Sequence, residues 1–320
     1  MLIDIIFIIV GVVMVLKGAD LLTEHASALA RRMNVPEIII GLTIVAAGTS
    51  APELFVSLVS ALKGTPDMAV GNVVGSNTMN AMLIVGCAAM VAPMTISRST
   101  VKKDIPFSVG ASILLMLLAL NSYLGRVDGI VLLLGFAAFM TYTLMQAKKP
   151  VESVPATEPT SPTTPTSPTK PTPVWLPILW LIAGLAMLVV GSNLFVDSAS
   201  SVALSLGISE GVVGLTVVAG GTSLPELATS VVAARKGQSA IAIGNVIGSN
   251  VFNILAILGL TATISPLAIE GITTVDMAVM LGSVSLVWLF SFTKFKVERW
   301  EGALLVVGYV VYLCWLISNL

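Results

Sequence analysis

A forty-residue segment occurs twice in this chain, and this repeat constrains the fold more than any other feature. Residues 41–80 align with residues 214–253 at an offset of 173 positions without a gap, and 24 of the 40 aligned positions are identical. The identities include helix breakers and polar residues, in the runs Gly-Thr-Ser-x-Pro-Glu and Gly-Ser-Asn. Two unrelated apolar segments would share mainly leucine, valine and alanine, so the polar identities indicate a duplicated working site.

Apolar runs of membrane-spanning length recur along the 320-residue chain, which is 56% hydrophobic and only 10% charged. A run of about 20 apolar residues can cross a bilayer as a helix, and lipid tolerates no unpaired backbone. We therefore predict an all-α polytopic membrane protein with ten transmembrane helices. The predicted spans are roughly 2–22, 37–61, 68–91, 105–121, 128–146, 175–196, 210–234, 240–263, 275–292 and 301–318.

Residues 148–174 separate the two halves of the chain. This segment is rich in proline, threonine and serine, which predicts an extended, disordered linker between five-helix repeats at residues 1–147 and 175–320. Because five is odd, the second repeat enters the membrane from the opposite side, so the repeats are expected to be inverted. With the N-terminus outside, the inside loops hold thirteen lysines and arginines and the outside loops two. This bias predicts external termini and a cytoplasmic linker, and we expect a prokaryotic plasma membrane.

Proline interrupts two of the predicted spans. Pro52 and Pro225 lie well inside apolar runs, each preceded by glycine four residues earlier. Proline lacks a backbone donor and clashes with the preceding turn of a helix. We therefore predict that helices 2 and 7 are broken, with the first break near residues 46–48 and a restart near residue 50. Such a break would free carbonyl oxygens, for which Ala46 and Ala219 are the candidates.

A glutamate follows each break directly. Glu53 and Glu226 are repeat mates, and a carboxylate at membrane depth costs at least about 2.5–3.5 kcal/mol. The second, third, seventh and eighth predicted spans contain no lysine or arginine. A bound cation is the simplest compensating partner.

Neutral oxygen ligands accompany the two carboxylates. Asn72, Ser76 and Asn80 are spaced i, i+4, i+8 on one helical face, and Asn245, Ser249 and Asn253 repeat this spacing. Hydroxyl groups come from Thr49, Ser50, Thr222 and Ser223. Hard cations such as calcium and sodium prefer oxygen ligands, whereas zinc and copper sites usually contain histidine or cysteine. Two carboxylates offset one divalent ion, so the sequence predicts a cation site shared by both repeats.

Structural interpretations of the same residues remain open at this point. Ser50-x-x-Glu53, like its repeat mate, fits a capping box that would only stabilise the restarted helix. The asparagine stripes are also compatible with hydrogen bonds between helices, and Asn77 and Asn250 have no assigned role.

The motifs resemble the alpha repeats of the cation/calcium exchanger superfamily, and the overall form resembles its prokaryotic sodium/calcium exchanger-like branch. The resemblance rests on GTSAPE and GTSLPE, each followed by GNVVGSN or GNVIGSN and a further asparagine. It implies alternating access, with calcium bound by Glu53 and Glu226 and by backbone oxygens near Thr49 and Thr222. It implies further ligands for sodium and calcium at Thr49, Ser50, Thr222, Ser223, Ala46, Ala219, Ser76, Asn80, Ser249 and Asn253.

The expected function is therefore a secondary antiporter that exchanges calcium for sodium, and a calcium/proton antiporter is the alternative. Some exchangers of the superfamily carry aspartate where this chain has Asn253, which weakens the case for potassium coupling. A channel is disfavoured because inverted repeats with broken helices suit alternating access. An enzyme is disfavoured because the chain has one histidine and no protease-type pairing. Beyond the transported ions and the bilayer, we expect no cofactor, no nucleic acid and no obligatory protein partner.

Overall fold

The computed structural model describes residues 2–147, 175–206 and 219–318. Across these ranges, eight helices are long and apolar enough to cross a membrane, and the bent pair Glu37–Thr49 and Ala51–Leu62 makes a ninth candidate span. The predicted linker at 148–174 and the first part of the seventh predicted span, up to residue 218, lie outside the described residues.

The elements of the first half run in close succession. In chain order they are α1 (Leu2–Met33), α2 (Glu37–Ile40), the π-helical η1 (Gly41–Val45), α3 (Ala46–Thr49), α4 (Ala51–Leu62), α5 (Pro66–Met79), the π-helical η2 (Asn80–Ile84), α6 (Val85–Val91), β1 (Met94–Thr95), the π-helical η3 (Thr100–Asp104), α7 (Ile105–Leu118), the 3₁₀ turn η4 (Ala119–Asn121), β2 (Tyr123–Leu124) and α8 (Arg126–Ala147).

The second half repeats this order about 173 positions later. Its described elements are α9 (Trp175–Ser205), α11 (Ala219–Thr222), α12 (Leu224–Arg235), α13 (Ser239–Val251), the π-helical η6 (Phe252–Leu258), α14 (Gly259–Ile264), β3 (Leu267–Ala268), α15 (Thr274–Ser291), β4 (Lys296–Val297) and α16 (Arg299–Ser318). The duplication seen in the central forty residues therefore extends to the elements on either side of them.

Two short antiparallel strand pairs join one half to the other. β1 pairs with β4 through Met94 opposite Val297, and β2 pairs with β3 through Leu124 opposite Leu267. Since β3 is the repeat mate of β1 and β4 that of β2, the two pairings are equivalent by the repeat. These strands were not expected from the sequence, because a two-residue strand has no periodicity to detect.

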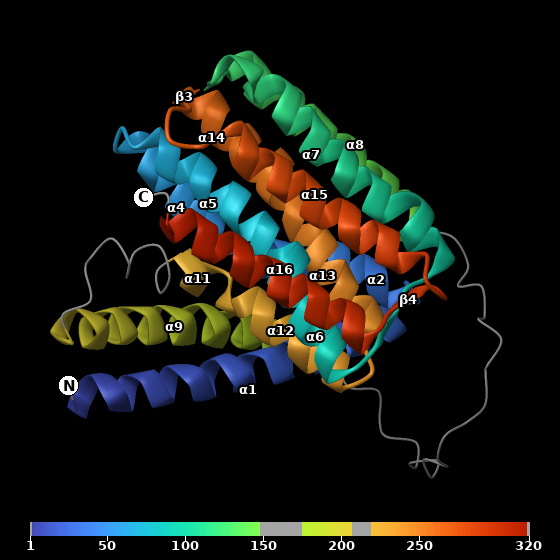
Figure 1. Cartoon of the computed structure of the whole chain (residues 1–320). Coiled ribbons are helices and arrows are strands. Elements are labelled where there is room, and N and C mark those ends of the chain that lie inside the picture. The colour runs from blue at the N-terminus through green and yellow to red at the C-terminus, as the bar shows by residue number, and fades with distance from the viewer. Residues whose placement is uncertain (1, 148–174, 207–218, 319–320) are drawn as a thin grey trace, which may run out of the picture.

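Helices α1 and α9 pack along each other and form the lower layer in Figure 1. Gly11 lies against Gly191 and Gly18 against Gly184, so the two helices are antiparallel. A Cβ added at Gly18 would lie 2.8 Å from the carbonyl oxygen of Gly184, as expected where small residues let helices approach closely. Both helices continue about ten residues beyond the predicted spans.

The extension of α1 has a physical cause. Its last turns bury Ala26, Ser27 and Ala30, which are small side chains that permit close packing. A hydropathy pattern ends where polar residues begin, at about residue 22, and does not register this buried small-residue face.

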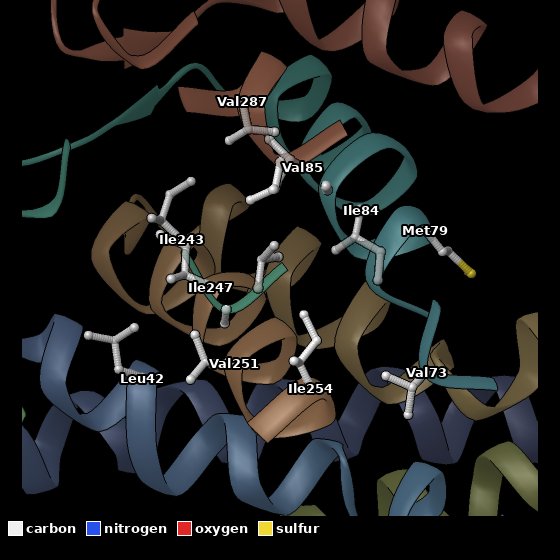
Figure 2. Close-up of a cluster of buried hydrophobic side chains, with 14 of the residues drawn as sticks. Leu42, Val73, Met79, Ile84, Val85, Ile243, Ile247, Val251, Ile254 and Val287 are labelled. Atoms are coloured by element: carbon white, nitrogen blue, oxygen red, sulfur yellow. The ribbon is translucent and has the colours of Figure 1, made fainter. Parts of the chain in front are cut away.

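The core surrounds α5 and α13 and their continuations. Most residues of the helical stretches 66–91 and 239–264 are buried, and Figure 2 shows Ile243, Ile247 and Val251 of α13 in the same cluster as Leu42. By contrast, α1, α8 and α16 expose large apolar side chains such as Phe7, Leu134 and Val311. Apolar surface on this scale suits contact with lipid rather than water.

Candidate cation-binding site

The first half of the site begins where the second span bends. Helix α3 ends at Thr49, α4 begins at Ala51, and the helix direction changes by 45° at this break. The π-helical segment η1 precedes the break, and π-helical turns are frequent at functional sites. In the second half α11 ends at Thr222 and α12 begins at Leu224, so Ser223 occupies the same position as Ser50.

The first break differs in detail from the prediction. It lies at Ser50 rather than at residues 46–48, and the carbonyl oxygen of Ala46 accepts a hydrogen bond from the Ser50 amide at 3.0 Å. The reason is that Pro52 stands in the first turn of α4, where a helix needs no amide donor. The preceding helix can therefore continue to Thr49, and the Ala46 carbonyl is not freed. Ala219 begins the short helix α11.

The two glutamates are buried and are held by the opposite half of the chain. Glu53 and Glu226 are 0% and 1% exposed. Ser50 Oγ donates to Glu226 Oε1 at 3.1 Å, and Ser223 Oγ donates to Glu53 Oε1 at the same distance. Each serine precedes one glutamate in sequence but bonds the other, so the two carboxylates belong to a single site.

The capping-box interpretation is wrong for both serines. Neither Ser50 nor Ser223 makes a side-chain cap to its own helix, because each hydroxyl instead reaches the glutamate across the repeat interface. The hydroxyl bonds of these serines therefore run between the two repeats rather than within one helix.

Four acceptor oxygens of the site are buried without a hydrogen-bond donor. They are Glu53 Oε2, Glu226 Oε2, Asn80 Oδ1 and Asn253 Oδ1. A buried acceptor left unpaired is costly and uncommon, and here two repeat-related pairs occur together. No lysine or arginine is buried in the part of the chain that the structure describes. A cation is the partner that would satisfy acceptors of this kind.

Hydroxyl groups line the same region. Ser223 Oγ lies 3.2 Å from Ser76 Oγ, which links the break of one repeat to the asparagine helix of the other. Thr49 Oγ1 lies 3.0 Å from Asn245 Oδ1. The mates Ser76 and Ser249 are both buried, and Thr222 is half-buried.

Asn72 and Asn245 form hydrogen bonds that connect the glutamate-bearing helices to their neighbours. The Asn72 amide donates to the Glu53 carbonyl oxygen at 3.1 Å and to Ser57 Oγ at 2.9 Å. Asn245 makes the equivalent bonds to the Glu226 carbonyl oxygen at 3.4 Å and to Ser230 Oγ at 3.0 Å. These amides fasten α4 to α5 and α12 to α13, which favours the interhelical hydrogen-bond interpretation for this pair.

The predicted site residues are therefore brought together to different degrees. Direct bonds join Ser50 to Glu226, and Ser223 to Glu53 and Ser76. Asn80 and Asn253 have buried free oxygens and bond Asn250 and Asn77, respectively. The sequence did not assign these last two asparagines, although their identity across the repeat was a usable signal. Among the described residues, no group of three or more histidine, cysteine, aspartate or glutamate side chains could hold a metal ion. The candidate ligands are thus two carboxylates and neutral oxygens.

Comparisons with known proteins identify the family to which the chain is similar. The family model described as "Sodium/calcium exchanger protein" matches the chain twice, at residues 3–145 and 176–318. The sodium/calcium exchanger MaX1 of Methanosarcina acetivorans is 34% identical over 97% of both chains. The inner membrane protein YrbG of Escherichia coli K12 is 37% identical over 99% of this chain and 97% of its own. A solved structure of the sodium-calcium exchanger NCX_Mj superposes with a TM-score of 0.84 and 30% identity, covering 98% of this chain and 99% of the other.

Proposed function

This chain belongs to the sodium/calcium exchanger family, and we propose that it is a secondary active antiporter that exchanges calcium for sodium across the membrane. The observation that carries the proposal is the set of four unpaired, buried acceptor oxygens beside two cross-bonded carboxylates. This charge of minus two suits one divalent ion or several monovalent ions, and oxygen ligands suit calcium and sodium.

In the proposed site, Glu53 and Glu226 are the calcium ligands and also contribute to sodium binding. Backbone oxygens near Thr49 and Thr222 complete the calcium coordination. The carbonyl oxygen of Ala46 accepts from the Ser50 amide at 3.0 Å and from Thr49 Oγ1 at 3.4 Å, so it would exchange the longer of these bonds for the ion. The remaining ligands for the transported ions are Ser50, Ser223, Ala219, Ser76, Asn80, Ser249 and Asn253. Because calcium and sodium use the same carboxylates, binding of one ion excludes the other, which is what obligatory exchange requires.

Alternating access is the proposed mechanism, with two inverted five-helix repeats and breaks in the second and seventh spans. The antiparallel packing of the repeat mates α1 and α9 supports inversion. The two helices share a close glycine contact, and an apolar pocket of about 370 Å³ lies between part of the pair and α12, lined by Val12, Phe195 and Leu227, among others. The pair is also bonded to the core, from Ser192 Oγ to the Gly221 carbonyl oxygen and from Lys236 to Asp20 and Thr23. In the proposed movement of the pair as a unit over the core, these bonds would break.

The membrane orientation is part of the same proposal. We place both termini outside and residues 148–174 in the cytoplasm, on the basis of the lysine and arginine distribution in the loops. The domain organisation is correspondingly two repeats, 1–147 and 175–320, joined by this linker.

The test is labelled calcium uptake into proteoliposomes loaded with sodium, with the pH clamped by ionophore. A matched set of vesicles carries only a proton gradient. Uptake driven by the sodium gradient is the expected result. Uptake driven only by protons would retain the site but assign the chain to calcium/proton exchange, in which a buried glutamate would carry the proton.

A further inference from the structure

Two asparagines next to the candidate ligands have no role in the site as described above. Asn77 on α5 and Asn250 on α13 are repeat mates, 1% and 3% exposed. Each lies one residue after a site serine and three residues before a site asparagine. Buried amides at this depth need a partner for every donor, so their hydrogen bonds indicate what they do.

The two amides hold the site asparagines of the opposite repeat. Asn253 Nδ2 donates to Asn77 Oδ1 at 3.0 Å, and Asn80 Nδ2 donates to Asn250 Oδ1 at 3.0 Å. As a result, the NH₂ groups of Asn253 and Asn80 face the neighbouring helix. The oxygens of the same two amides are the buried acceptors that have no donor.

A backbone contact sets the direction of the Asn77 amide, and with it that of Asn253. Asn77 Nδ2 donates to the Asn250 carbonyl oxygen at 3.2 Å, and a carbonyl oxygen can only accept. Asn77 must therefore present its oxygen on the other side, toward Asn253. Asn253 in turn must offer its NH₂ group to Asn77, which leaves Asn253 Oδ1 for the site. With the opposite orientation, Asn253 would point two donor hydrogens toward a cation.

We propose that Asn77 and Asn250 are positioning residues that orient the amide oxygens of Asn253 and Asn80 toward the transported cation. They act through these neighbours and are not themselves ligands. The inference rests on the proposed function, since it needs a cation at the site. Groups that orient metal ligands typically change metal affinity by roughly 10- to 100-fold when removed.

The experiment measures how calcium changes the thermal unfolding of the full-length chain in detergent, with choline chloride as the ionic-strength control. Asn77→Leu keeps the branching at Cγ and removes both the donor and the acceptor. We expect the half-saturating calcium concentration to rise about tenfold or more. Thr78→Val is the matched control, because Thr78 is buried on the same helix and its hydroxyl bonds only the Val74 carbonyl oxygen. Its calcium response should equal that of the parent.

Repeating Asn77→Leu in an Asn253→Asp variant distinguishes a loss of amide orientation from a loss of packing. In Asn253→Asp both sides of the side chain carry oxygen, so at pH 8 no partner is needed to turn an oxygen toward the site. Asn77→Leu should then change the half-saturating calcium concentration less than about twofold. An equal loss in both backgrounds would mean that Asn77 only packs, and would overturn the proposal. If these variants do not accumulate, Asn250→Leu with Asn80→Asp provides the same comparison in the other repeat.

The proposed function can fail separately. If neither calcium nor sodium stabilises the parent chain, the cation site itself is wrong and the positioning role falls with it. If the parent responds and Asn77→Leu responds equally, only the positioning role is wrong.

Discussion

Replacing Glu53 by glutamine tests the site most directly, because it removes one charge and changes little else in shape. Two unit charges about 4 Å apart interact by about 4 kcal/mol at an effective dielectric constant near 20, so a divalent ion at this distance gains roughly 8 kcal/mol from one carboxylate. The amide oxygen and reorganised water recover part of this gain. We expect a net loss of about 4 kcal/mol, which corresponds to roughly three orders of magnitude in calcium affinity.

The same substitution should act in the opposite direction on stability without calcium. Glu53 is fully buried, and its Oε2 atom has no donor. Removing a carboxylate from membrane depth recovers up to about 2.5–3.5 kcal/mol. The cation-free variant should therefore unfold at a higher temperature than the parent, while the stabilisation by calcium is lost.

Two assays check these expectations together. Sodium-driven calcium uptake into proteoliposomes should fall to background, and thermal unfolding in detergent should give the stability change with and without calcium. Glu226→Gln should behave alike, since Ser50 bonds Glu226 as Ser223 bonds Glu53. Calcium uptake at the parental rate by either variant would refute the shared-carboxylate site.

Three further perturbations test the helix packing, the linker and an ion pair outside the candidate site. Gly18→Leu should prevent accumulation of folded protein, measured by size-exclusion chromatography, because its Cβ would lie 2.8 Å from the Gly184 carbonyl oxygen; a monodisperse variant would contradict the close packing. Deleting residues 152–169 should leave calcium uptake almost unchanged, because a Pro/Thr/Ser-rich segment serves as a tether; complete loss would exclude that role. Lys236 pairs with Asp20 at 2.6 Å, but both side chains are partly exposed at 29% and 49%. A double-mutant cycle on unfolding should give a coupling below about 1 kcal/mol, and a value several times larger would show that the pair is shielded from solvent.

The sequence was sufficient to predict an all-helical membrane protein, and it singled out the two glutamates that the structure buries. Long apolar runs and a gap-free repeat are strong signals, and both survive in the helices α5 and α13 that carry the asparagines. Helix ends were less predictable. The last turns of α1 bury small side chains such as Ala26, and burial of that kind depends on the neighbouring helix.

The pairing of side chains was not predictable, because the two repeats carry the same residues. Ser50 can reach Glu53 in a capping box or Glu226 across the interface, and both options have the same sequence pattern. Only the packing of the two halves selects Glu226. The role of Asn77 was hidden for the same reason, since the direction of its amide depends on the Asn250 carbonyl oxygen in the other half. The role of Asn250 was hidden because its partner Asn80 also lies in the other half.

The site is therefore a product of both repeats, although each repeat contains nearly every residue type that it needs. Ser50 donates a hydrogen bond to Glu226, Ser223 donates one to Glu53, and Asn77 accepts one from Asn253. These bonds join α4, α5, α12 and η6 or the breaks beside them, and none of them involves α1 or α9. In the proposed transport cycle, α1 and α9 can move over the core without breaking these bonds. The duplicated residues are partners rather than spare copies, so losing a glutamate in one half should not be compensated by its mate in the other.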